Sequence, residues 1–375
     1  MNLTTTLASP THALADDTEA ESLSLRLASP SDLPHIGTLL RLRDGHPWDD
    51  ADVRRAVCDW NPARCSTWLA MVGNIPVGMS SIQLRTLQCG TDTYRAGYWT
   101  LLYVHPEYRL RMVYPTLPQA MFRAAKAEGL DFIYANVRLP RVARSHQRIG
   151  FKAVAEMPVL AKPLRPVQLL VRHKGLKLAP ECLGRPLDGL YAAYLRLRWW
   201  HTLGNTPATE QAWDSPELVQ VAALWREAKA GYVAQQWTAD LLRKRYAAPG
   251  PAANYGLSVV RRKGRVAAAA VYRAVSRERL RTGILLDLVY AEEDTASAQR
   301  VLAAAEHAMY DAGCQVMLAL DGPDTRLGPV LRGYGYLRSS EKYAFLILPC
   351  RALAPGSPLY DASRWNYGFG DHDAF

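Results

Sequence analysis

The first half of the chain alternates between segments with a two-residue hydrophobic period and segments with helical spacing. Residues 23–27 alternate apolar and polar side chains, which is typical of a strand with one buried face. Ile36, Leu39 and Leu40 then share one face of a helix that Ser31 or Asp32 can cap. The predicted strands are 23–27, 66–72, 77–84, 98–104, 132–137 and one from Phe151 onward, and the further predicted helices are 49–60, 113–129 and 144–149.

The second half of the chain repeats this order of elements. A turn separates two apolar strands in both halves, at residues 73–76 and again at 261–265. The predicted elements are helices 215–232 and 238–247, strands 255–260, 266–273 and 283–290, helix 296–313 and strand 316–320. Similarity at a fixed spacing of about 185 residues indicates an internal duplication.

This repeat predicts the organisation of the chain. The expected parts are a flexible leader 1–22, an N-terminal domain 23–160, a linker with one docking helix 161–214, a C-terminal domain 215–350 and a tail 351–375. The amphipathic stretch Leu187–Trp200 forms the docking helix. Its cluster Arg196–Trp200 is interpreted as filling an interdomain seam, with a membrane-surface or partner patch as the alternative.

Composition places the chain among ordinary globular proteins. Hydrophobic residues make up 49% and charged residues 21% of its 375 positions. No run approaches the roughly 18 apolar residues of a membrane helix, so no transmembrane segment is expected. The N-terminus lacks the pattern of a signal peptide, which favours a cytoplasmic location. Six cysteines without C-x-x-C pairs or Cys/His clusters predict reduced thiols and no metal site.

The net charge of +10 admits several classes of partner. Solvated surface explains most of the spread-out arginines, and a phosphate-bearing ligand would use a few of them. Binding of nucleic acid is not expected, because no helix-turn-helix or zinc-finger pattern occurs.

One stretch combines these signals into a candidate site. The strand ending at Val104 stops at Pro106, a basic loop with Arg109 and Arg111 follows, and a long helix begins near Val113. A helix N-terminus offers unpaired N–H groups and partial positive charge, which suit a pyrophosphate.

This stretch resembles motif A of the GNAT superfamily of acyl-CoA-dependent N-acyltransferases. In that family a strand, a V-x-P-x-x-R turn and a glycine-bearing loop precede the helix that holds the coenzyme A pyrophosphate. Asn136–Phe151 resembles the motif that follows. Here Met112 and Tyr114 stand where the family usually has glycine. The resemblance implies an α/β fold of two tandem GNAT-like domains, each a central mixed β-sheet flanked by helices.

The resemblance also implies a site and a reaction. The residues expected to bind the co-substrate, acetyl-CoA or another acyl-CoA, are Leu102, Val104, Arg109, Leu110, Arg111, Met112, Val113 and Tyr114. An N–H near the end of strand 98–104 would polarise the thioester carbonyl. His146 stands four residues before Gly150, where the family has its general acid, and His105 or Glu107 would deprotonate the amine.

The acceptor is expected to be a small-molecule amine, for example an amino sugar. In the second half Glu292, Glu293 and Asp294 replace the basic loop, and Leu331 replaces the acid. That half is therefore expected to support binding or assembly, since acidic residues repel a pyrophosphate. A catalytically inactive scaffold with this fold is the alternative interpretation, and a homodimer is an arrangement that the sequence leaves open.

Overall fold

A computed structural model describes residues 22–45, 48–57, 65–174, 181–204, 208–247, 255–277, 279–291, 293–354 and 356–371. The predicted leader lies outside this part of the chain, except for Ser22. The first half contains β1 (Leu23–Leu27), α1 (Leu33–Asp44), α2 (Asp50–Val57), β2 (Cys65–Val72), β3 (Ile75–Cys89), β4 (Asp92–Val104), α3 (Val113–Ala127), β5 (Phe132–Val137), α4 (Pro140–Arg148) and β6 (Lys152–Pro163).

The patterns locate these elements and miss some of their ends. β3 and β4 form a hairpin that is longer than the two predicted strands. α4 begins at Pro140 and not at Arg144, because proline fits the first turn of a helix, where its missing N–H costs nothing.

The linker differs from the prediction by one helix. α5 (Pro166–Lys174) precedes α6 (Glu181–Leu203), and Asp188 of α6 accepts hydrogen bonds from the N–H groups of Val167 and Gln168 at 2.9 and 3.2 Å. The neighbouring residues Trp199 and Trp200 of α6 differ in burial. Trp199 is buried against α9 in the core of the second half, whereas Trp200 is 74% exposed, so the two rings do not fill a seam together.

The second half follows the same order as the first. It contains β7 (Thr209–Glu210), α7 (Leu218–Lys229), β8 (Ala234–Gln235), α8 (Ala239–Tyr246), β9 (Tyr255–Arg262), β10 (Arg265–Arg277), β11 (Leu280–Tyr290), α9 (Thr295–Asp311), β12 (Val316–Leu320), α10 (Leu327–Gly333) and β13 (Leu337–Pro349). The predicted mixed α/β class with two tandem units is confirmed.

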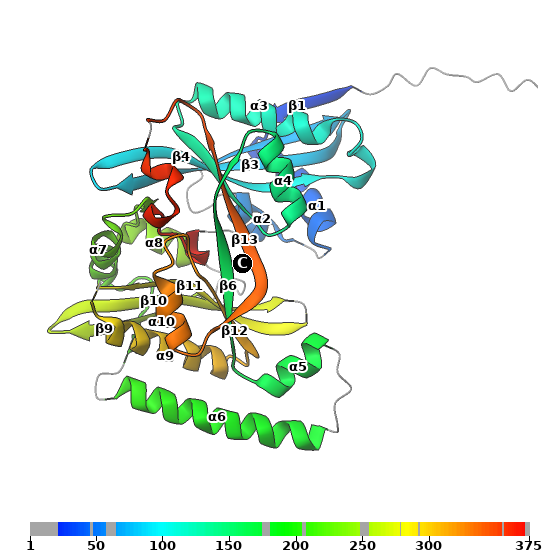
Figure 1. The fold of residues 1–375 in the computed structure, drawn as a ribbon. Helices are drawn as coiled ribbons and strands as arrows, with labels where there is room; N and C mark the ends of the chain where they lie inside the picture. Colours follow the sequence, from blue (N-terminus) through cyan, green and yellow to red (C-terminus); the bar gives the residue numbers. More distant parts are fainter. Residues whose placement is uncertain are drawn as a thin grey trace, which may run out of the picture.

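The two halves exchange their last strands and share one sheet. The strand order is β1-β2-β3-β4-β5-β13-β6-β12-β11-β10-β9-β7. β13 of the second half therefore pairs with β5 of the first half. In return, β6 of the first half pairs with β12 of the second half. Figure 1 shows β6 and β13 running side by side between the halves. Each half therefore depends on the other for one strand.

A buried ion pair lies where β6 enters the second half. Lys162 of β6 donates to Glu306 Oε2 on α9 at 2.6 Å, and both side chains are almost fully buried. Trp199 of α6 donates to the same oxygen at 2.9 Å. Glu306 therefore connects a strand and two helices from different parts of the chain.

The C-terminal tail is part of the core. Trp365, Tyr367 and Phe369 are buried between the halves, and the Trp365 ring lies 5.8 Å from that of Phe132 on β5. The tail thus covers one face of the first half's sheet with aromatic side chains.

Candidate functional site

β4 and β5 separate at the centre of the first half. These parallel strands pair only over 96–98 and 132–134. Beyond Tyr98, β4 carries an extra residue against β3, and Leu101 has a φ of 52° at this bulge. A bulge bends a strand and turns it away from its neighbour. The backbone of β4 past Tyr98 thereby no longer pairs with β5, and we call this end of the pairing the opening.

The basic loop leads from this opening into helix α3. Arg109, Leu110, Arg111 and Met112 are exposed, with Leu110 at 96%. Arg109 Nε donates to the Val104 carbonyl at 3.4 Å, and the Arg111 guanidinium lies 5.2 Å from the Tyr108 ring. Both guanidinium groups therefore remain at the surface beside the helix N-terminus.

Met112 adopts a left-handed backbone conformation, which favours glycine. Its φ of 61° and ψ of 14° place it in the left-handed region, directly before α3. The first helical bond of α3 runs from the N–H of Thr116 to the carbonyl of Met112 at 3.2 Å. The amides of Val113 and Tyr114 precede that bond, so they belong to the free donors of a helix start.

Three predicted residues contribute their backbone to this region and turn their side chains away. Val104 of β4 and Val113 of α3 belong to one buried apolar cluster, which attaches α3 to the sheet. Leu102 packs on the cluster around Trp99. A ligand in the opening would meet the amides of these residues more than their side chains.

His146 lies in the core of the first half. It is 4% exposed, and its ring stacks on that of Trp99 with 4.2 Å between centroids. Burial lowers the pKa of His146 to about 4, although a backbone interaction with Val142 partly opposes the shift. At neutral pH the imidazole is therefore uncharged. Its Nδ1 lies 3.4 Å from the hydroxyl of Tyr114, so α4 and the start of α3 meet at these two side chains.

This burial makes a stability prediction. An unfolded histidine has a pKa near 6.5, so the contribution of neutral His146 is fully present above pH 6.5 and is lost as the pH falls toward 4. One pKa unit corresponds to about 1.4 kcal/mol, which gives a loss of about 2 kcal/mol at pH 5. We expect His146→Phe to lose that much less stability than the wild type between pH 7 and pH 5, measured by urea unfolding. Equal losses in both proteins would contradict the assignment.

The two candidate bases, His105 and Glu107, directly follow the end of β4. His105 donates its backbone N–H to the carbonyl of Val77 at 2.8 Å, and its ring lies edge-on to Tyr108. Its Nδ1 is buried without a hydrogen-bond partner among the described residues. Glu107 is exposed in the turn that follows. The structure brings neither side chain to His146.

Asn136 is a candidate that sequence reasoning did not place in the site. It lies on β5 two residues beyond the last pairing with β4, on the face of the sheet that also carries Tyr134. Both polar atoms of its amide are buried without a hydrogen-bond partner among the described residues. The available signal was an amide side chain within the apolar strand 132–137.

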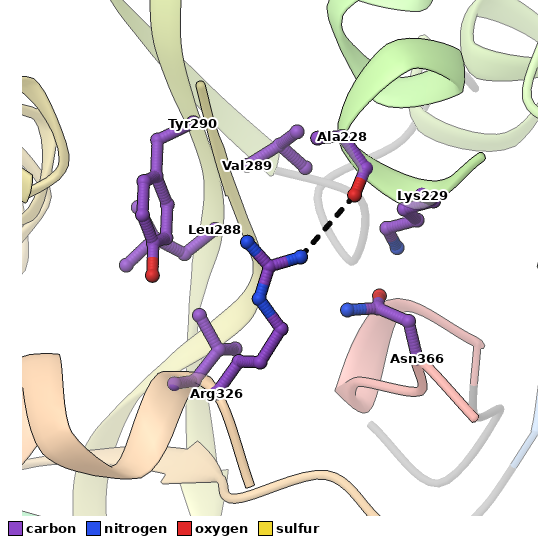
Figure 2. Close-up of a pocket in the computed structure, with 8 residues that line it drawn as sticks. Ala228, Lys229, Leu288, Val289, Tyr290, Arg326 and Asn366 are labelled. Carbon is purple, nitrogen blue, oxygen red and sulfur yellow. Dashed lines mark hydrogen bonds between the residues drawn. The ribbon is translucent and has the colours of Figure 1, made fainter. Parts of the chain in front are cut away.

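The equivalent place in the second half is a small pocket that Arg326 narrows. Leu288–Tyr290 of β11 corresponds to Leu102–Val104 by the duplication. Figure 2 shows the guanidinium of Arg326 beside these residues, donating to the carbonyl of Ala228 at 3.3 Å, with Lys229 and Asn366 opposite. The tail covers Leu286, the extra residue of β11 against β10, since a Cβ on Gly368 would lie 3.0 Å from the Leu286 carbonyl oxygen.

The acidic residues of that half act at a helix start. Asp294 accepts from the N–H of Ser297 at 3.1 Å and pairs with Arg262 at 3.0 Å, so it caps α9. Glu292 lies outside the described residues. Among the residues that the structure describes, no group of three or more histidine, cysteine or acidic side chains could hold a metal ion.

Comparison with known proteins agrees with this geometry. Residues 33–151 match the family model for the GNAT family of acetyltransferases. No curated protein matches the chain by sequence. Within the described ranges, no helix is long and apolar enough to cross a membrane.

Several solved structures share the fold. N-myristoyltransferase of Saccharomyces cerevisiae with bound myristoyl-CoA superposes with a TM-score of 0.62 at 14% identity, over 88% of this chain and 80% of that one. A probable N-acyltransferase from Enterococcus faecalis V583 gives 0.59 at 9% identity, over 88% and 73%. A GCN5-related N-acetyltransferase from Anabaena variabilis ATCC 29413 gives the same values. At these identities the likeness concerns the fold.

Proposed function

We propose that this chain, whose residues 33–151 form a domain of the GNAT acetyltransferase family, transfers an acyl group from an acyl-CoA to an amine. The observation that carries the proposal is the left-handed backbone of Met112. A non-glycine residue there costs about 1 kcal/mol, and the conformation sets the amides of α3 beside two exposed arginines. Such an arrangement suits the pyrophosphate of coenzyme A.

The opening beyond Tyr98 would hold the reacting thioester. The amine nitrogen forms a bond to the carbonyl carbon, and the C–S bond then breaks to release the coenzyme A thiolate. N–H groups of β4 that no longer pair with β5 would donate to the oxygen as negative charge develops on it. The ammonium proton leaves to a base, for which His105 and Glu107 remain the proposed candidates.

Tyr114 and His146 would deliver a proton to the leaving thiolate. Burial raises the pKa of Tyr114, with a hydrogen bond from Ser145 opposing it, so the phenol stays protonated at neutral pH. The uncharged His146 has its Nδ1 3.4 Å from that phenol oxygen, and the tautomer with its proton on Nδ1 would donate to the oxygen and leave the phenol O–H free. We propose that the phenol gives its proton to the thiolate, with His146 orienting it.

The acceptor would lie beside Asn136, at the end of the sheet face that the tail covers at Phe132 and Tyr134. A buried amide without partners costs free energy unless a ligand satisfies it, and an amine with neighbouring hydroxyl groups could do so. A short acyl group such as acetyl is proposed, because the rings of Tyr98 and Tyr134 lie 5.3 Å apart where the strands begin to pair. An amino sugar as the acceptor, a cytoplasmic location, a homodimer and the domain bounds 23–160 and 215–350 likewise remain proposals.

Restoring glycine to the loop should strengthen coenzyme A binding. Met112→Gly opens space for the pyrophosphate beside the start of α3, so we expect acyl-CoA to bind about threefold to tenfold more tightly. Lys263→Gly is the matched control, because Lys263 has a φ of 50° in a turn of the second half. An equal change in affinity in both variants, measured by calorimetry, would contradict the assigned site.

The function itself is tested by thiol release from acetyl-CoA in the presence of a panel of amino sugars, amino acids and polyamines. We expect one class of amine to stimulate release. Asn136→Leu should then lower kcat/KM for the amine at least tenfold while leaving the affinity for acetyl-CoA unchanged. Acetyl-CoA binding without release for any amine would favour the scaffold alternative.

A further inference from the structure

Helix α6 exposes an apolar face at one end of the molecule. Five large apolar side chains of this helix lie on its outer side, and Leu190, Leu197 and Trp200 are 70%, 65% and 74% exposed. We call this surface the α6 apolar face; its residues are Leu187, Leu190, Tyr194, Leu197 and Trp200. In Figure 1 α6 lies along the lower edge of the molecule, and α5 lies beside one end of it.

The opposite side of α6 already fulfils the ordinary role of an amphipathic helix. Leu195 and Trp199 are buried against α9, within the core of the second half. A helix that is apolar on both sides is normally covered on both. The outer side has no cover among the described residues, so it differs from single exposed apolar residues such as Val219.

The arrangement of charge around this face identifies the partner. At 3.6 residues per turn, the five apolar residues span about 140° of the helix surface. Arg196 follows directly at one edge of that arc. Arg198 follows at the other, where its guanidinium donates to the Gly333 carbonyl at 3.3 Å and lies over the Tyr334 ring. The only acidic side chain between residues 186 and 203 is Asp188, which is buried and bound to the start of α5. The outer side of α6 is thus an apolar strip between two arginines, with the exposed His201 at its C-terminal end.

Such a strip matches the interface of an anionic lipid bilayer. Arginine side chains reach the phosphate groups while leucines enter the acyl region, and tryptophan and tyrosine prefer the boundary between them. A second copy of this chain fits less well, because two such faces would bring four arginines together without a described carboxylate between them. α5 extends the apolar area with Leu170 and Val171, which are exposed next to α6.

We propose that the α6 apolar face binds this protein to the surface of membranes that contain anionic lipids. The helix lies in the plane of the interface and does not cross the bilayer. This inference does not depend on acyl transfer, and it provides an interpretation of the arginine and tryptophan cluster at residues 196–200.

The test is co-sedimentation with vesicles at low ionic strength. The wild type should sediment with vesicles of phosphatidylcholine and phosphatidylglycerol and remain in solution with pure phosphatidylcholine. Leu190→Ser with Leu197→Ser should weaken binding more than about tenfold, because two buried leucines are lost from the interface. Arg196→Gln should weaken it about fivefold, and added salt should weaken the wild type.

The control is Ile75→Ser with Val219→Ser, which removes two apolar side chains of similar exposure from other elements. It should bind as the wild type does, and all variants should unfold at similar temperatures, because the changed residues face outward. The proposal is overturned if the wild type stays in solution with anionic vesicles, or if the control loses binding equally. It is also overturned if light scattering shows a dimer that the leucine variant converts to a monomer without any vesicle binding.

Discussion

Replacing Glu306 with alanine is expected to lower the free energy of unfolding by about 3–5 kcal/mol. The change leaves the ammonium group of Lys162 buried at 2% exposure without its carboxylate. It also removes the acceptor of the Trp199 indole N–H. Because Lys162 lies on the exchanged strand β6, the loss should loosen the connection between the halves. Chemical unfolding followed by circular dichroism measures the effect.

A double variant separates the cost of an unpaired charge from the value of the pair. Lys162→Met with Glu306→Leu removes both charges and fills their space with apolar atoms, so most of the stability should return. If the double variant were as unstable as Glu306→Ala, the instability would arise from lost packing. If Glu306→Ala cost less than about 1 kcal/mol, the ion pair would not hold the junction.

Replacing Arg109 and Arg111 together with alanine is expected to weaken acyl-CoA binding about a hundredfold. Each guanidinium can form charge-assisted hydrogen bonds to a phosphate, and such bonds are worth about 1.5–3 kcal/mol before screening by solvent. Both side chains are exposed, which places the combined effect near ~2.7 kcal/mol, equivalent to that factor. In steady-state kinetics the KM for acyl-CoA should rise while kcat changes little.

The matched control removes two arginines from the other half. Arg261 and Arg262 are the last two residues of β9, so Arg261→Ala with Arg262→Ala changes the net charge equally. This control should bind acyl-CoA within about twofold of the wild type. A similar loss in both variants would show that the arginines act through the overall charge of the chain, and would contradict a specific phosphate site at the loop.

The period of the hydrophobic residues predicted the elements of the fold, but it did not predict which strands β6 and β13 pair with. Strand β5 is predicted to the residue, because its apolar run is bounded by Gly129 and a proline at Pro140. The exchange of β6 and β13 could not be predicted. Residues 159–161 of β6 are apolar and could pair through their backbone with β5 as well as with β12, since strand pairing carries little sequence information.

The position of the candidate site was predictable, and its details were not. Pro106 and the arginines locate the loop, but the left-handed conformation of Met112 follows from tertiary structure that overrides the residue's own preference. Counting residues places His146 near the loop without revealing that it stacks on Trp99. The tail offered no periodicity, and its aromatic residues are buried because both halves contact them.

The central claim is that the loop of the first half binds one acyl-CoA and that its counterpart in the second half does not. Calorimetric titration of the wild type with acetyl-CoA tests this directly. We predict saturable binding with one site per chain, because Arg326 and the tail narrow the corresponding place in the second half to a small pocket. No binding, or two equivalent sites per chain, would contradict the account.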